Sequence, residues 1–109
     1  MSTPIDLQTL RAFVAVAREG NVSRAAQALH RSQPAVSLQL KSLADSTGLL
    51  LFTRTPQGLA LTRDGAALLP HAEKVLATLG DFGQAAQKLH STVRGTLRIG
   101  TILDPEFTR

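Results

Sequence analysis

Three polar residues, Gln33, Ser37 and Lys41, are spaced four apart in the 109-residue sequence. Residues four apart lie on one face if the segment is an α-helix. That face would offer an amide, a hydroxyl and a cation, groups that bind base edges and phosphates of DNA. Leu38 lies about 200° from Val36 at roughly 100° per residue, so we expect it to face outward, where it can contact a thymine methyl group. The alternative is an ordinary solvated helix face.

The positive charge is concentrated in one part of the chain. Residues 1–63 carry seven basic and three acidic side chains, a net +4, whereas residues 64–109 carry five of each. The whole excess of +4 therefore lies in the segment that contains the polar face. This distribution favours a polyanionic partner for that segment.

The side chains needed for catalysis and metal binding are missing or scattered. The chain has no Cys, and its histidines (His30, His71 and His90) have no carboxylate at metal-ligand spacing. We therefore expect no enzyme activity, no disulfide, no metal and no cofactor. No apolar run reaches the ~20 residues of a membrane span, and the N-terminus lacks a signal-peptide layout. These features predict a cytoplasmic, nucleoid-associated protein.

Three helices must position the polar face. Apolar spacing predicts a helix over 6–18, capped by Asp6, and a second over 24–30, capped by Ser23. In the second helix, Ala25 and Ala26 would allow another helix to approach closely.

A third helix is predicted over 33–47, with Ser32 as its N-cap and Pro34 in its first turn. Its inward stripe is Val36, Leu40 and Leu43, and Gly48 ends it. The second and third helices form a helix-turn-helix pattern.

A hairpin and a long helix follow. Short strands over 51–54 and 59–61 flank a turn that contains Pro56 and Gly58, which is typical of a wing. Thr62 caps a linker helix over 63–92, and a further strand is expected over 96–103. The linker helix carries a heptad seam of apolar residues: Leu68, Ala72, Val75, Leu79, Phe82, Ala86 and Leu89.

The seam can pack on its own domain or on a second copy of the chain. A winged domain of 63 residues offers little surface for a helix of this length. We therefore expect a homodimer through the seam.

Residues 21–37, which read NVSRAAQALHRSQPAVS, resemble the signature of LysR-type transcriptional regulators. The resemblance continues at residues 48–65 and at 94–100, which read RGTLRIG. It implies a mainly α fold, with a winged helix-turn-helix over 1–62, a linker and dimerisation helix over 63–92, and the hinge and first strand of an effector-binding domain over 93–109.

The resemblance also implies a function and partners. Members of this family bind interrupted inverted repeats in double-stranded DNA as dimers with antiparallel linker helices, and they usually form tetramers. A small-molecule inducer would bind the effector domain, which this chain would lack almost entirely, and RNA polymerase is a further candidate partner. The runner-up function is a winged-helix module for protein interaction and dimerisation that does not bind specific DNA sequences.

Ten residues are the expected DNA contacts. They are Arg31, Ser32, Gln33, Pro34, Ser37, Leu38, Lys41, Arg54, Thr55 and Gln57. The phosphate ligands among them are expected to be Arg31 and Lys41, while Arg54 either reaches the backbone beside the minor groove or braces the hairpin.

The sequence departs from the family pattern at four positions. Leu38 and Gln57 stand where the family often has basic residues, and Ala44 and Thr47 stand where it often has Glu and Leu. Two usual cationic contacts are therefore absent.

Overall fold

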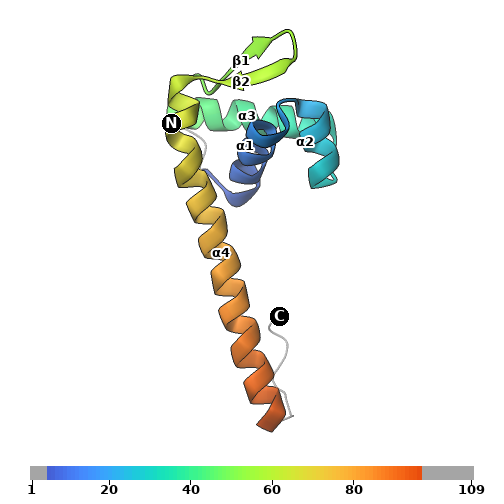
Figure 1. The fold of residues 1–109 in the computed structure, drawn as a ribbon, viewed down its shortest axis with the longest axis vertical. Helices are drawn as coiled ribbons and strands as arrows, with labels where there is room; N and C mark the ends of the chain where they lie inside the picture. Colours follow the sequence, from blue (N-terminus) through green and yellow to red (C-terminus); the bar gives the residue numbers. More distant parts are fainter. Residues whose placement is uncertain (1–4, 97–109) are drawn as a thin grey trace. The chain divides into compact units, whose positions relative to one another are not determined.

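The chain is mainly helical, as predicted. A computed structural model describes residues 5–96 of the chain. The elements are α1 (Leu7–Glu19), α2 (Val22–Leu29), α3 (Gln33–Thr47), β1 (Phe52–Thr55), β2 (Gly58–Leu61) and α4 (Arg63–Thr96) (Figure 1). The strand expected over 96–103 lies outside the described residues, except for Thr96, which is the last residue of α4. No helix within residues 5–96 combines the length and the apolar character needed to cross a membrane.

Helix α1 begins and ends where its capping residues predict. The Asp6 carboxylate accepts hydrogen bonds from the backbone N–H and the hydroxyl of Thr9, both at 2.8 Å. These two bonds hold the pKa of the Asp6 carboxyl below its ordinary value. At the other end Gly20 is left-handed (φ 77°), and its N–H donates to the Val16 carbonyl.

The predicted start of α2 is wrong by two residues. Asn21, not Ser23, is the N-cap, and its side chain accepts from the Arg24 N–H at 2.8 Å. Asn and Ser cap helices about equally well, but starting at Asn21 brings Val22 into the helix, where it packs against the core. The hydroxyl of Ser23 is therefore not used for capping. The helix ends at Leu29, one residue before the predicted end, because His30 takes a left-handed conformation (φ 57°).

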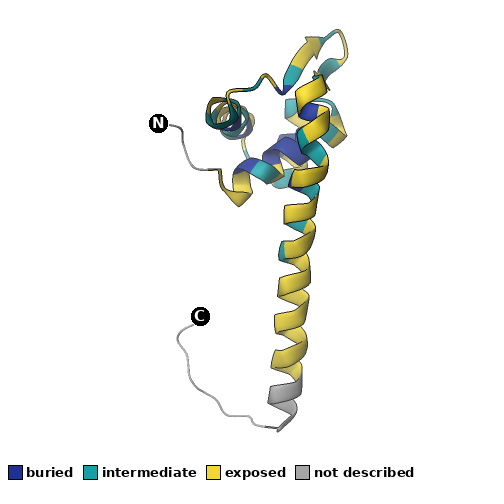
Figure 2. Ribbon diagram, turned by 90° about the vertical axis from the view of Figure 1, so that its left-hand side faces the viewer, coloured by how far each residue is buried: buried dark blue, intermediate teal, exposed yellow. Residues whose placement is uncertain are grey.

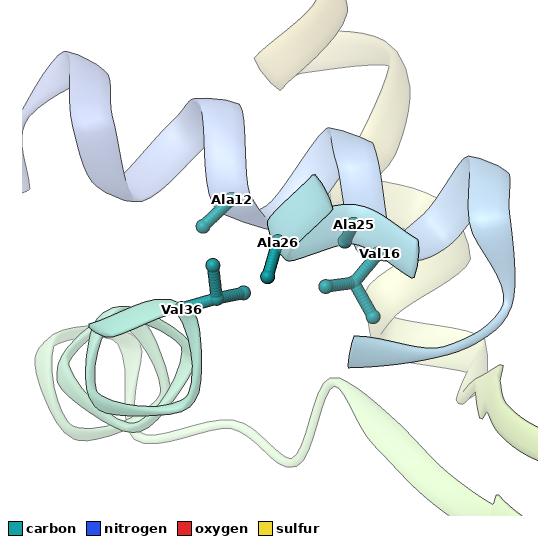
Figure 3. Packing of buried hydrophobic residues seen from close by; sticks show 5 residues of the cluster. All are labelled: Ala12, Val16, Ala25, Ala26 and Val36. Carbon is teal, nitrogen blue, oxygen red and sulfur yellow. The ribbon is translucent and has the colours of Figure 1, made fainter. Parts of the chain in front are cut away.

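Small residues join the first three helices. One buried cluster consists of Ala12 and Val16 from α1, Ala25 and Ala26 from α2, and Val36 from α3 (Figure 3). The alanines have no side chain beyond Cβ, so the helix backbones can come close and leave no large void. The predicted close approach at Ala25 and Ala26 is confirmed.

A second buried cluster joins α1, α3, the segment before β1 and the first turns of α4. Its members are Phe13, Val14, Leu43, Leu51 and Ala72. The ring of Phe13 also meets that of Phe52 edge to face, with centroids 5.7 Å apart and planes at 72°. This contact fixes β1 against α1.

The two strands form the predicted hairpin. β1 and β2 pair antiparallel, with Phe52 opposite Leu61 and Thr55 opposite Gly58. The N–H of Leu59 donates to the carbonyl of Gly20 at 2.9 Å, which ties the hairpin to the end of α1. Gly58 adopts φ +140°, and a Cβ there would overlap that same carbonyl oxygen.

Thr62 caps α4 and fastens it to the chain before the hairpin. Its hydroxyl accepts from the Gly65 N–H at 2.9 Å and donates to the Leu50 carbonyl at 2.6 Å. Gly65 lies so close to the Leu51 carbonyl oxygen that a Cβ would overlap it.

The first turns of α4 pack on the winged domain. The described chain divides into two compact units, the first ending at Leu76 and the second beginning at Ala77. Within the first unit Ala72 is buried and Leu68 is half-buried, whereas the later seam residues Phe82 and Leu89 are 73% and 68% exposed. Figure 2 shows the later turns of α4 as exposed. The first residues of the seam therefore pack within this chain, whereas its later residues are exposed.

The close packing at Gly65 can be tested by Gly65→Ala. In an open helix, Ala in place of Gly stabilises by about 0.5–1 kcal/mol. Here the new Cβ overlaps the Leu51 carbonyl oxygen, so we expect the free energy of unfolding to fall by about 1–3 kcal/mol. Gly80→Ala is the matched control, because nothing lies within 4 Å of a Cβ at Gly80, and it should stabilise the protein. Urea denaturation measures both changes, and an equal gain for the two variants would contradict the packing.

Candidate nucleic-acid interface

Helix α3 begins at an exposed, capped end. The hydroxyl of Ser32 accepts from the Ala35 N–H at 3.2 Å, which confirms the predicted N-cap. Pro34 lies in the first turn, where its missing N–H costs no helical hydrogen bond. Ser32, Gln33 and Pro34 are all exposed. The positive end of the helix dipole is therefore accessible to an anion.

The orientation of α3 is the one that the sequence predicts. Val36 is fully buried and Leu43 is 3% exposed, so these residues face the core. Gln33, Ser37 and Lys41 are exposed together on the other side. Leu38 is 67% exposed, so its side chain is accessible to a ligand. The described structure thus brings an amide, a hydroxyl, a cation and an apolar side chain onto one accessible helix.

Lys41 forms an ion pair on this face. Its ammonium lies 3.2 Å from the Asp45 carboxylate, and the two side chains are 71% and 61% exposed. Exposed pairs of this kind contribute little because water and salt screen them. Lys41 can therefore exchange Asp45 for a stronger anion at small cost.

Arg31 is held by α1. Its guanidinium Nη1 donates to the Gln8 side-chain oxygen at 3.0 Å. A guanidinium has five N–H donors, so this bond leaves others for a phosphate. The contact orients Arg31 at the turn between α2 and α3.

Gln33 has a partner that the sequence analysis missed. The Ser23 hydroxyl donates to Oε1 of Gln33 at 3.0 Å, across ten residues. Periodicity within one helix gives no sign of such a bond. The only available signal was the helix-turn-helix pattern, which brings the start of α2 near the start of α3.

The hairpin carries the other predicted contacts. Arg54 is exposed on β1, and Gln57 is exposed in the turn, while Thr55 is half-buried. Among the described residues Arg54 has no hydrogen bond and no ion pair, so nothing there supports the alternative that it braces the hairpin. Its guanidinium is accessible to a ligand.

The winged domain also has an apolar groove away from the exposed face of α3. This groove of about 240 Å³ lies between α1, α3 and the first turns of α4. It is lined by Ile5, Leu10, Phe13, Leu43, Thr47, Leu68, His71, Ala72 and Val75. No group of His, Asp and Glu able to hold a metal ion occurs in the part of the chain that the structure describes.

Comparison with known proteins identifies the family. The model of bacterial regulatory helix-turn-helix proteins of the lysR family matches residues 7–66. The regulator CfxR of Cupriavidus necator is 40% identical over 103 residues, which are 94% of this chain and 32% of that protein. The chain therefore spans about a third of the length of this relative.

Two solved structures of similar fold are complexes with DNA. The CbnR DNA-binding domain bound to DNA superposes with a TM-score of 0.71 at 34% identity, covering 78% of this chain and 98% of that chain. The BenM DNA-binding domain bound to catB site 1 DNA gives a TM-score of 0.75 at 29% identity, covering 79% and 97%.

Three helices around a small core, followed by a two-stranded hairpin, define a winged helix-turn-helix domain. The chain belongs to the LysR family of bacterial regulatory helix-turn-helix proteins, as its resemblance predicted. The family consists of transcriptional regulators, in agreement with the expectation that this region is not an enzyme.

The cap of α3 can be tested by Ser32→Ala. Loss of the bond to the Ala35 N–H should lower the free energy of unfolding by about 1 kcal/mol. Ser37→Ala is the matched control: Ser37 is exposed within the same helix and its hydroxyl makes no hydrogen bond in the described structure. That control should change stability by less than about 0.5 kcal/mol. Equal effects of the two substitutions in urea denaturation would contradict the capping role.

Proposed function

We propose that this chain is the DNA-binding part of a bacterial transcriptional regulator and that it binds an interrupted inverted repeat as a dimer. The observation that carries the proposal is the accessible surface of α3, where Gln33, Ser37, Leu38 and Lys41 are exposed while Val36 is buried in the core. The DNA complexes of its structural relatives support this choice of ligand.

In this proposal α3 lies in the major groove. Gln33 makes a bidentate contact with adenine, Ser37 binds a base or a phosphate, and Leu38 touches a thymine methyl group. Pro34 fits the close approach of the first turn, since it presents no N–H and only a compact ring.

Phosphates are bound around this helix and at the wing. The exposed N-terminus at Ser32 directs backbone N–H groups at one phosphate. Arg31 and Lys41 neutralise others. At the wing Arg54 reaches the backbone beside the minor groove, with Thr55 and Gln57 nearby. The net charge of +4 in residues 1–63 is consistent with phosphate binding by this segment.

The dimer forms through α4. In the described structure Leu68 and Ala72 pack against the core of the winged domain. The part of the seam available to a second copy therefore consists of Val75, Leu79, Phe82, Ala86 and Leu89. Val75, Phe82 and Leu89 are seven residues apart and exposed. This spacing suits pairing with a second linker helix, which we propose to run antiparallel.

The relative CfxR is longer than this chain. CfxR is about three times as long as the matched region. We propose that residues 1–62 bind DNA, that 63–92 dimerise, and that 93–109 lead into an effector-binding domain. That domain would bind the inducer and complete a tetramer, and contact with RNA polymerase would belong to the full-length protein.

DNA binding is tested by fluorescence anisotropy with inverted-repeat duplexes selected by the chain from a randomised library. The proposal has three phosphate-binding cations per protomer, namely Arg31, Lys41 and Arg54. Each neutralised phosphate contributes about −0.9 to the slope of the logarithm of the association constant against the logarithm of the salt concentration, so we expect a slope of about −3 per protomer. An affinity that does not respond to salt would contradict phosphate binding. It would favour the alternative of a protein-interaction module.

The dimer is tested by sedimentation at micromolar concentration. We expect twice the monomer mass of 11.6 kDa. Phe82→Glu places a charge in the seam and should yield monomers, because an unpaired charge is costly to bury. Gln84→Glu adds the same charge off the seam and should leave the dimer intact. An 11.6 kDa species for the unsubstituted chain would contradict the dimer.

A further inference from the structure

A hydrogen bond links the first turns of the two helices of the helix-turn-helix. The Ser23 hydroxyl on α2 donates to Oε1 of Gln33 on α3 at 3.0 Å, and both side chains are exposed. Neither helix needs this bond for its own end, because Asn21 caps α2 and Ser32 caps α3. The bond therefore acts on the orientation of the Gln33 side chain.

The two ends of the Gln33 amide differ in chemistry. Oε1 accepts hydrogen bonds and Nε2 donates them, and rotation of the terminal torsion exchanges the two ends at low cost. A hydroxyl can donate or accept, so Ser23 could pair with either end of the amide. The positive end of the α2 dipole favours the oxygen over the amide N–H at this place, and the Ser23 hydroxyl then donates to Oε1. The side chain is thus held with Oε1 toward α2.

This orientation matters for reading a base. A carbonyl oxygen has two lone pairs, so Oε1 can accept from Ser23 and from a second donor in the amide plane. The remaining lone pair and the N–H beside it match adenine, whose major-groove edge has a donor at N6 and an acceptor at N7. A rotated amide would set donor against donor and acceptor against acceptor. Guanine, with acceptors at N7 and O6, does not match either arrangement fully.

We infer that Ser23 is a positioning residue for Gln33, which sets the preference of α3 for adenine through the bond to Oε1 without touching DNA itself. This inference rests on the proposed function, since it assigns Gln33 to a base edge. It adds a specificity-determining residue outside the ten expected DNA contacts.

The test compares base preference. The 109-residue chain and its Ser23→Ala variant each select duplexes from a randomised library. The position read by Gln33 is identified as the one at which Gln33→Ala abolishes the preference for a base. Each protein is then titrated with four duplexes that differ only in the base pair at this position. We expect Ser23→Ala to reduce the preference for adenine by about two- to tenfold, the range of one ordinary hydrogen bond. Ser23→Thr keeps the hydroxyl and should retain the preference.

A second comparison separates positioning from direct contact. In the Gln33→Ala background, adding Ser23→Ala should leave the affinity for the selected duplex unchanged, because the side chain that Ser23 orients is gone. A further loss of affinity there would mean that Ser23 contacts DNA itself, and would overturn the inference. Thermal melting of each variant verifies that the fold is kept.

The outcomes distinguish this inference from the proposed function. If the unsubstituted chain selects specific duplexes and Ser23→Ala shows the same preference for adenine, only the role of Ser23 is wrong. If the unsubstituted chain selects no specific sequence, the proposed function and the role of Ser23 both fail.

Discussion

The arrangement of the winged domain depends on the contact of three helices through small side chains. Ala12, Ala25 and Ala26 let α1, α2 and α3 meet closely, and Val36 fills the space between them. Because Val36 must be buried, the rotation of α3 about its axis is fixed. That rotation puts Leu38 and its polar neighbours on the accessible side. A larger residue at any of the alanines would move α3 and with it the contacts proposed for this helix.

Hydrogen bonds at the helix ends fix the positions of the hairpin and of the start of α4. Thr62 bonds to the Leu50 carbonyl and to the Gly65 N–H, so the start of α4 is fixed to the segment between α3 and β1. The bond from Leu59 to the Gly20 carbonyl fixes the hairpin to the end of α1. The wing and the linker helix are thereby both anchored to the core. These contacts connect a DNA-binding surface with the segment proposed to dimerise.

Periodicity and capping chemistry predicted the fold and the orientation of α3. The sequence showed that Val36 and Leu43 face inward and Leu38 outward, since helical spacing alone determines faces. It did not identify contacts between helices, such as those from Ser23 to Gln33 and from Arg31 to Gln8. The start of α2 was predicted wrongly: Asn21 was assigned to the stop after α1 and Ser23 to the cap, although Asn and Ser cap helices about equally well, and Asn21 is the cap. The heptad seam was treated as one surface because spacing cannot tell that Ala72 is already buried in its own domain.

The central claim is that the outward face of α3 meets the major groove. The chain contains no cysteine, so Leu38→Cys introduces a single thiol at a position that is exposed in the described structure. The rate of alkylation of this thiol is measured with and without saturating duplex of the selected sequence, with Gln87→Cys on the exposed part of α4 as the reference. The account predicts that DNA protects the thiol at position 38 and leaves the reference unprotected. Equal alkylation rates at position 38 with and without DNA would contradict it.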